Sequence, residues 1–330
     1  EASQMGLAHA AVLAPLGRTL LCTGDPKQLA PITHSTHPVA KKWLGRSPFD
    51  VMGSAPRVQL NEQSRMCEEI CAVVAKRFYD GDLKVASEYQ SNARWHGERE
   101  VALTRSLERR RFVIIRIESE GAFNYYEKGP FRRESAVRIA ELAAECVDGG
   151  HPPHDVLVVT PYHGQRQAIR EQLRTLRIEG VDVATVHSIQ GSERHTVLVD
   201  PVCGNDEFFR NEMGGDRLIN VAISRAKARV VLLLSADDHK NPTFRAIAQL
   251  AQPPRAVLTG PSVHYWKADP AYPRCLVGKY ICTPKHCGTV TKLENNEGLW
   301  IYLSEEFSGV VVKLRLQVLE DLAARNTACR

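Results

Sequence analysis

The chain has 330 residues, of which 43% are apolar, and its 43 basic and 38 acidic residues give a formal net charge of +5. This length predicts two domains or a domain and a half. No run approaches the roughly 18 apolar residues that span a bilayer, and the N-terminus lacks a basic-then-apolar signal, so we expect a cytoplasmic protein, or a nuclear one in a eukaryotic cell. The small basic surplus permits a nucleic-acid partner without requiring one.

Short apolar, β-branched runs alternate with segments of helical period over most of the chain. The runs that predict strands are Thr19–Thr23, Phe112–Ile117, Val156–Thr160, Val181–Val186, Thr196–Val202 and Arg229–Leu234. Their nearly continuous apolar character is typical of strands buried on both faces of a parallel sheet.

Apolar stripes at helical spacing lie between these strands. They run from Met66 to Phe78, from Ile139 to Cys146 and from Ile169 to Leu176. The alternation of strand and helix predicts an α/β, doubly wound domain with a parallel sheet. The polar stretch Tyr89–Arg99 predicts a surface loop.

The pattern changes after Gln252-Pro253-Pro254, where turn signals and alternating strands begin. The strand predictions here are Lys279–Cys282, Gly288–Leu293, Leu299–Leu303 and Val310–Leu319, with a hairpin turn at Asn295–Gly298. This part of the sequence predicts a small antiparallel β-barrel or SH3-like appendage.

Several polar residues are candidates for the groups that an ATPase with its active site between two lobes requires. Such an enzyme needs a carboxylate base, a polar sensor of the γ-phosphate and cations that close on the phosphates. Gln28 lies after the first predicted strand, Arg65 precedes a predicted helix, and Arg225 precedes a predicted strand. The planar fork of arginine suits phosphate oxygens.

These residues fall in six short motifs. In chain order the motifs are Glu1-Ala2-Ser3-Gln4, Gly24–Ile32, Gln63–Met66, Thr160–Gln165, Thr185–Glu193 and Asn220–Lys227. As an ordered set they resemble the motifs of superfamily 1 helicases, in the 5′-to-3′ branch that contains the nonsense-mediated-decay and replication helicase–nuclease types. In that resemblance, Glu1–Met5 is the Walker B stretch after its aspartate. Gly24–Ile32 is motif III, and the last two motifs are V and VI.

The resemblance covers about residues 1–240 and implies a RecA-like, P-loop NTPase-type fold. Residues 1–55 are expected to be the C-terminal tail of a first lobe, from within Walker B through motif III. Residues 56–252 are expected to form the second lobe, and residues 253–330 an accessory β domain.

The resemblance also implies a role for each motif residue. Glu1 corresponds to the base that activates water, and Gln28 to the γ-phosphate sensor. Arg65 and Arg225 correspond to the phosphate-contacting arginines. The residues expected at the nucleotide are Asp25, Gly191, Glu193 and Lys227, and those expected at the nucleic acid are Thr160, Tyr162, Thr185 and His187. Two alternatives stay open: Tyr162 packs a turn, or His187 is a core histidine.

The sequence departs from the family pattern at three places. Ser64 and Ile189 stand where the family carries aromatic residues, and the 330 residues contain no Gly-x-x-x-x-Gly-Lys-Ser/Thr loop. ATP and Mg²⁺ are the implied cofactors, and both require the half that carries this loop. We therefore expect the C-terminal part of a helicase or translocase acting on single-stranded DNA or RNA, completed by a first lobe in cis or in trans.

Two other functions remain open at this point. The chain is a non-catalytic scaffold derived from a helicase, although retention of Gln28, Arg65 and Arg225 argues against this. Alternatively, residues 253–330 recruit a protein partner through Trp300, Tyr302 and Lys313, which are otherwise barrel core. DNA and RNA are not distinguished, because tracking a backbone is tolerant of sequence.

The cysteines do not predict a metal site. The tightest group is Cys275, Cys282, His286 and Cys287, which lacks the paired Cys-x-x-Cys spacing of zinc ribbons. Without a secretory signal, we expect the nine cysteines to be reduced thiols.

The purified 330-residue chain is expected to hydrolyse no ATP at a measurable rate, because nothing in it cradles the β-phosphate. A coupled assay of phosphate release with saturating single-stranded oligonucleotide tests this. Steady turnover that rises with added oligonucleotide contradicts the prediction.

Overall fold

The computed structural model divides the chain into two compact units, Glu1–Ala251 and Gln252–Arg330. It describes residues 1–53, 55–101, 104, 107, 110–124, 129–189, 191–206, 209, 215–251, 280–282, 287–295, 299–304 and 311–315. Each unit is described by itself below. In the described part of the chain, no helix combines the length and apolar character that crossing a membrane requires.

The first unit is built on a five-stranded parallel sheet in the order β3-β9-β8-β6-β7. Every neighbouring pair in this sheet runs parallel. The strands are β3 (Phe112–Arg116), β6 (Val156–Val159), β7 (Asp182–Ala184), β8 (Arg194–Val199) and β9 (Ala226–Leu234). This order confirms the predicted doubly wound α/β domain and all of its strands except the first.

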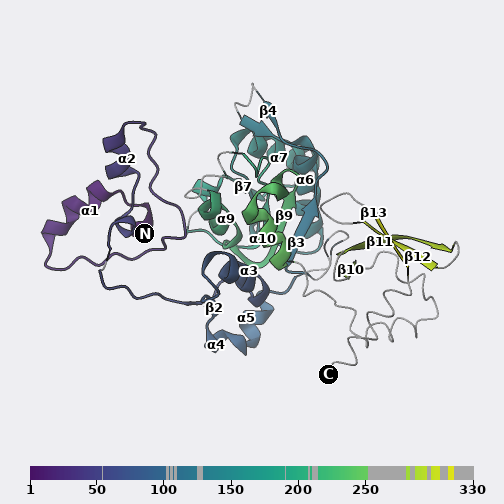
Figure 1. Ribbon diagram of the computed structural model, residues 1–330, viewed down its shortest axis with the longest axis horizontal. Coiled ribbons are helices and arrows are strands. Elements are labelled where there is room, and N and C mark those ends of the chain that lie inside the picture. The colour runs from purple at the N-terminus through teal and green to yellow at the C-terminus, as the bar shows by residue number, and fades with distance from the viewer. Residues whose placement is uncertain are drawn as a thin grey trace. The chain divides into compact units, whose positions relative to one another are not determined.

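Helices cover both faces of this sheet. One layer contains α3 (Glu68–Phe78), α9 (Gly215–Ile223) and α10 (Pro242–Ala251), and the other contains α6 (Arg133–Asp148) and α7 (His163–Thr175). The helices α6 and α7 pack against each other, as Figure 1 shows. The three predicted helical stripes correspond to α3, α6 and α7, although Met66 precedes α3 and Leu176 follows α7.

Alternation along the strands explains the two layers. In β9, Val230 and Leu232 join the core under α3, α9 and α10, whereas Val231 and Leu233 join the core under α6 and α7. Successive side chains of a strand point to opposite faces, so a strand covered on both sides must be apolar throughout. The sequence of β9 meets this requirement from Val230 to Leu234, and these residues are buried.

The remaining elements of the first unit are short. They are the helices α1 (Leu7–Leu13), α2 (Pro38–Leu44), α4 (Ser87–Gln90) and α5 (Ala93–Gly97), the 3-10 turns η1 (Ala2–Gln4), η2 (Ala14–Leu16), η3 (Pro48–Asp50), η4 (Pro153–Asp155), η5 (Val186–Ser188) and η6 (Asp238–Lys240), and the strands β1 (Glu62–Gln63), β2 (Lys84–Val85), β4 (Ala122–Asn124) and β5 (Gly129–Phe131). The pair β1–β2 is parallel, and the pair β4–β5 is antiparallel.

Two predictions about local structure are wrong. The segment Thr19–Thr23 forms no strand, because no strand of the described residues lies beside it and a strand needs a paired neighbour. The stretch Tyr89–Arg99 is not a plain surface loop, since it contains the end of α4 and all of α5. Trp95 and Arg99 are each only 5% exposed there, so this polar-looking stretch carries a small core of its own.

A fully buried ion cluster joins α6 to the carboxyl ends of β8 and β9. Arg132 donates through Nη2 to Asp200 at 2.6 Å and through Nη1 to Asp238 at 2.7 Å. Gln165 of α7 donates to the same Asp200 at 2.7 Å and to the carbonyl of Arg132 at 3.0 Å. Each carboxylate therefore has several donors, as a buried charge requires.

The second unit contains an antiparallel sheet in the order β10-β11-β12-β13. Its strands are β10 (Tyr280–Cys282), β11 (Cys287–Asn295), β12 (Leu299–Ser304) and β13 (Val311–Arg315). The four predicted strands are confirmed. Closure into a barrel stays a prediction, and most of the predicted hairpin turn at Asn295–Gly298 lies outside the described residues, as do Cys275 and His286 of the cysteine group.

Replacing Arg132 by methionine is expected to lower the free energy of unfolding by about 3–5 kcal/mol, because two buried carboxylates lose their cation. Urea denaturation followed by circular dichroism measures the change. Arg138→Met is the control, because Arg138 pairs with Glu141 on the surface of α6, and it should change stability by no more than about 0.5 kcal/mol. Equal stability of the two variants contradicts the prediction.

Candidate functional site

Two cations from distant parts of the chain meet at the carboxylate of Glu193. Arg65 donates through Nε to Oε2 at 2.8 Å, and the Nζ of Lys227 lies 2.9 Å from Oε1. Hydrogen bonds from Lys227 and Arg65 lower the pKa of Glu193 from 4.5 to about 2. The carboxylate is therefore charged throughout the physiological range.

The parallel sheet brings these residues together at the amino ends of β8 and β9. Glu193 directly precedes β8, and Lys227 is the second residue of β9. The two strands are paired through Arg194 and Ala226. The backbone N–H of Cys67, just after Arg65, donates to the carbonyl of Lys227 at 2.8 Å and attaches the start of α3 to this edge.

Arg225 lies beside this cluster, in the turn between α9 and β9. The residue is 3% exposed, and its guanidinium donates to the carbonyl of Val221 at 3.1 Å and to Oε1 of Gln28 at 3.2 Å. Among the residues that the structure describes, no carboxylate lies within 4.0 Å of this guanidinium. Burial, together with the charge of Arg65, lowers the pKa of Arg225 to about 10. Arg225 is thus a desolvated cation without a close counter-ion.

The loop that carries Gln28 is tied to two helices. Asp25 accepts from Nε2 of Gln28 at 2.9 Å and from the hydroxyl of Tyr79. Asn220 of α9 donates to the Tyr79 oxygen and to the carbonyl of Lys27, both at 2.9 Å. Asp25 therefore orients Gln28 rather than presenting a free carboxylate.

Glu1 and Gly191 are the remaining residues predicted at the nucleotide. Glu1 accepts a hydrogen bond from Gln4 and is close enough to Arg225 to raise its pKa. Gly191 has a φ of +81°, which disfavours other residues, and open space lies where a side chain would begin. The structure therefore brings Glu1, Gln28, Arg65, Glu193, Arg225 and Lys227 to one region of the molecule.

The cluster suits a polyphosphate better than it suits a metal ion. Arg65, Arg225 and Lys227 meet in this region, and guanidinium and ammonium groups are donors that suit phosphate oxygens. Among the described residues, no group of three or more His, Cys, Asp or Glu could bind a metal ion. The phosphates of ATP fit these residues, whereas Mg²⁺ finds no ligand set in the described part of the chain.

Two of the residues predicted at the nucleic acid lie at the opposite edge of the sheet. Thr160 follows β6 and Thr185 follows β7, and the last residues of these strands are paired through Val159 and Ala184. Both threonines are buried, at 0% and 8% exposure. The Thr160 hydroxyl has no hydrogen-bond partner among the described residues, and that of Thr185 lies 3.4 Å from Ser188 Oγ.

Tyr162 and His187 differ in their exposure. Tyr162 is half-buried, and burial, followed by the nearby Cys203 and Asp206, raises its pKa. His187 is exposed in η5, which argues against a place in the core. The structure thus presents His187 to solvent, whereas both threonines are buried.

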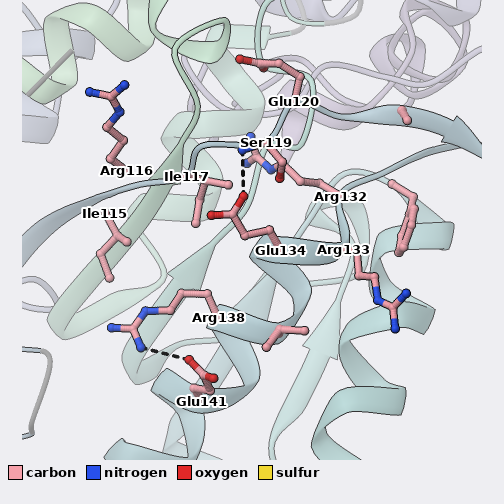
Figure 2. A pocket seen from close by; sticks show the side chains of 13 residues that line it. Ile115, Arg116, Ile117, Ser119, Glu120, Arg132, Arg133, Glu134, Arg138 and Glu141 are labelled. Carbon is pink, nitrogen blue, oxygen red and sulfur yellow. Dashed lines mark hydrogen bonds and ion pairs between the residues drawn. The ribbon is translucent and has the colours of Figure 1, made fainter. Parts of the chain in front are cut away.

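A pocket of about 880 Å³ lies elsewhere, beside the start of α6. Figure 2 shows Glu134 accepting from the backbone N–H of Ser119, at 2.8 Å, and Arg138 paired with Glu141 at 3.1 Å. None of the predicted site residues lines this pocket. Since these charges are already paired within its wall, we place the functional site at the Arg65–Arg225 cluster instead.

Sequence reasoning missed several residues that position the site. Tyr79 is the residue after α3, and its hydroxyl bridges Asp25 and Asn220. Trp95 and Arg99 bind the carbonyl of Ser64, next to Arg65. An aromatic residue at a helix end or an arginine in a polar stretch carries no local signal of such a role.

In the second unit, two of the residues predicted to recruit a protein partner, Tyr302 and Lys313, contact each other and neighbouring charged residues. The Tyr302 hydroxyl donates to Glu294, and the ammonium groups of Lys292 and Lys313 lie 5.4 and 5.5 Å from the Tyr302 ring centroid. The Trp300 side chain lies outside the described residues.

Comparison with known proteins shows which proteins this chain resembles. The profile of the AAA domain family matches residues 44–237. The chain is 26% identical over 246 residues to regulator of nonsense transcripts 1 from Caenorhabditis elegans, which covers 66% of this chain and 21% of that protein. It is 28% identical over 222 residues to DNA polymerase alpha-associated DNA helicase A from Schizosaccharomyces pombe, covering 65% and 33%. With DNA replication ATP-dependent helicase/nuclease DNA2 from Xenopus laevis the identity is 27% over 255 residues, covering 71% and 24%.

The chain thus spans between about a fifth and a third of the length of these relatives. Among solved structures, the C-terminal domain of a possible DNA helicase from Lactobacillus plantarum overlaps 56% of this chain and 92% of its own, with 12% identity and a TM-score of 0.34. A score this low carries no weight, and the fold assignment rests on the sheet order and the family profile.

The stability that Glu193 contributes should depend on pH in a defined direction. Because its pKa is depressed in the folded chain, the contribution is complete above pH 4.5 and is lost as the pH falls towards about 2. The difference in unfolding free energy between wild type and Glu193→Gln should therefore shrink over this interval. Thermal unfolding between pH 7 and pH 2.5 measures it. The exposed Glu171→Gln serves as the control and should show no such trend.

Proposed function

The chain belongs to the AAA domain family of superfamily 1 helicases, and from this premise we propose that it supplies the closing half of an ATP-dependent helicase or translocase. The observation that carries the proposal is the desolvated guanidinium of Arg225 beside Gln28. A buried cation without a close carboxylate is costly unless an anion completes it during function.

The proposed roles follow from the contacts of each side chain. Arg225 and Arg65 bind and orient the phosphate oxygens, and their fixed charges stabilise the charge that develops on these oxygens. Gln28 lies within hydrogen-bond distance of Arg225, so it can report the state of the γ-phosphate to the second lobe. Hydrolysis of bound ATP supplies the free energy for movement.

In this scheme the carboxylate of Glu193 binds the cations until a phosphate group of the nucleotide replaces it. This carboxylate binds Arg65 and Lys227 at 2.8 and 2.9 Å, distances that a phosphate oxygen can also adopt. On nucleotide binding, Arg65 would exchange this carboxylate for a phosphate. Glu193 is 41% exposed and can then be solvated by water.

The first lobe is the proposed partner, whether on the same polypeptide or on another. Most of the exposed large apolar side chains of the described residues fall between positions 12 and 60, with Leu16 at 79% and Leu21 at 84% exposure. Such a concentration is typical of a surface that another folded layer covers. The range 12–60 also contains Gln28, the proposed sensor of the γ-phosphate. A folded layer that covers this range would therefore also lie beside the nucleotide.

Single-stranded DNA or RNA is the proposed track. His187 is exposed after β7, next to Thr160 and Thr185 at the carboxyl edge of the sheet. This edge is opposite to the one with Arg65, Arg225 and Lys227. A movement of the lobe on ATP binding would therefore shift the nucleic-acid residues together with these cations. The direction from 5′ to 3′ is proposed on the family resemblance.

In the parent polypeptide, Arg225→Ala is expected to lower kcat for strand-stimulated ATP hydrolysis by about 10³-fold or more, as for other arginines that contact the transferred phosphate. Arg174→Ala, which alters an exposed arginine at the end of α7, is the matched control and should leave kcat unchanged. A coupled ATPase assay with a single-stranded oligonucleotide measures both.

Equal kcat values for the Arg225 variant and the control would contradict the proposal and favour a non-catalytic scaffold. The reading frame of the parent polypeptide gives an independent check. An aspartate immediately before Glu1 and a phosphate loop upstream agree with the role of Glu1 as the base that activates water.

A further inference from the structure

The segment that carries Arg65 is anchored by a second arginine. Arg99 donates through Nε to the carbonyl of Arg65 at 3.0 Å and through Nη2 to the carbonyl of Ser64 at 2.9 Å. Trp95 donates its indole N–H to the same Ser64 carbonyl at 2.6 Å. Two side chains from one short stretch thus bind two consecutive carbonyls of the phosphate-directed motif.

These carbonyls require such donors because they lie outside regular structure. Helix α3 begins at Glu68, after the capping residue Cys67, so Ser64 and Arg65 cannot use the helix for hydrogen bonding. Ser64 is exposed and Arg65 is half-buried, so outside the helix their carbonyls pair with water or with side chains, and Arg99 and Trp95 are the side chains that bind them here. Without Arg99 and Trp95, the backbone before α3 would lose these hydrogen bonds.

The arginine that provides them is itself buried at a cost. Arg99 is 5% exposed, and burial lowers its pKa. Its nearest carboxylate belongs to Glu98, at 3.8 Å and 54% exposed, which offsets little of that cost. The Arg99 guanidinium instead lies 3.9 Å from the Trp95 ring centroid and donates to the Trp95 carbonyl at 2.7 Å.

Arg65 is therefore bound at both of its ends. Its backbone carbonyl accepts from Arg99, whereas its guanidinium donates to Glu193 and, at 3.1 Å, to the carbonyl of Ser224. The side-chain contacts form only if the backbone stands at the right distance from β8. An error of about 1 Å in such a group can reduce catalysis about 10²-fold.

We propose that Arg99, supported by Trp95, is a positioning residue that presents Arg65 to the nucleotide. The inference rests on the proposed function for the role of Arg65, but the geometric coupling between Arg99 and Arg65 can be tested without nucleotide. The stretch from Trp95 to Arg99 then has a function that its polar sequence conceals: its side chains hold the backbone of Ser64 and Arg65 in place.

The test uses the 330-residue chain and the carboxyl resonance of Glu193, followed by ¹³C NMR as the pH is lowered. In Arg99→Lys, the charge remains but the fork that reaches two carbonyls is lost. Arg65 should then leave Glu193, and the pKa of Glu193 should rise part of the way from about 2 to 4.5, because Lys227, the larger cause of its depression, stays in place. Exchange of the Arg65 Nε–H with solvent should become faster in the same variant.

Trp95→Phe is the matched variant. It keeps an aromatic ring beneath the guanidinium but removes the indole N–H together with part of the buried ring, while Arg99 still donates to Ser64. The Glu193 pKa should therefore stay near about 2. A folded Arg99→Lys chain in which the Glu193 pKa and the exchange rate of the Arg65 Nε–H equal those of the wild type overturns the proposal.

If the lysine variant does not fold, Arg99→Gln replaces it, since glutamine keeps one amide donor and buries no charge. Failure of both variants to fold would show a role in general stability and would also overturn the proposal. If the pKa of Glu193 rises in Arg99→Lys as expected but Arg225→Ala leaves ATP hydrolysis unchanged, the proposed function is rejected and the positioning role of Arg99 stands.

Discussion

The structure around the site depends on one carboxylate between two cations. Arg65 and Lys227 are far apart in the sequence, and with Arg225 they carry like charges that repel one another at this edge of the sheet. Glu193 offsets this repulsion when no phosphate is present. Its exposure of 41% matters here, because a partly solvated carboxylate can release its cations at less cost than a buried one. The arrangement is therefore stable without an anion and still suited to receive one.

The parallel sheet separates two kinds of chemistry. The phosphate-directed residues Glu193, Arg225 and Lys227 lie at the amino ends of β8 and β9, whereas Thr160 and Thr185 lie at the carboxyl ends of β6 and β7. Ligands of open α/β sheets usually bind at the carboxyl ends. The cluster at the amino ends departs from this rule, and under the proposed function one sheet would carry two sites on opposite edges. A small rotation of the sheet would then move both sites together.

Much of this could be predicted from the sequence, and the exceptions have a common cause. Apolar runs such as Val156–Thr160 and Arg229–Leu234 predict buried parallel strands because burial on both faces leaves no other pattern, and the motif order indicates the family. The segment Thr19–Thr23 has the composition of a strand but no paired neighbour among the described residues. Trp95 and Arg99 look like surface residues because their partners, the carbonyls of Ser64 and Arg65, are about thirty positions away. Local pattern encodes burial well, but it does not encode which distant carbonyl a side chain binds.

Three buried arginines show how the surroundings of a charge separate structure from function. Arg132 is bound by two buried carboxylates, so its charge is neutralised and the cluster joins α6 to the sheet. Arg99 has carbonyls and an aromatic ring instead, which suits a residue that fixes a backbone. Arg225 has carbonyls and Gln28 but no described carboxylate within 4.0 Å, and burial together with the charge of Arg65 lowers its pKa. Under the proposed function, a bound anion beside Gln28 would offset this cost of desolvation.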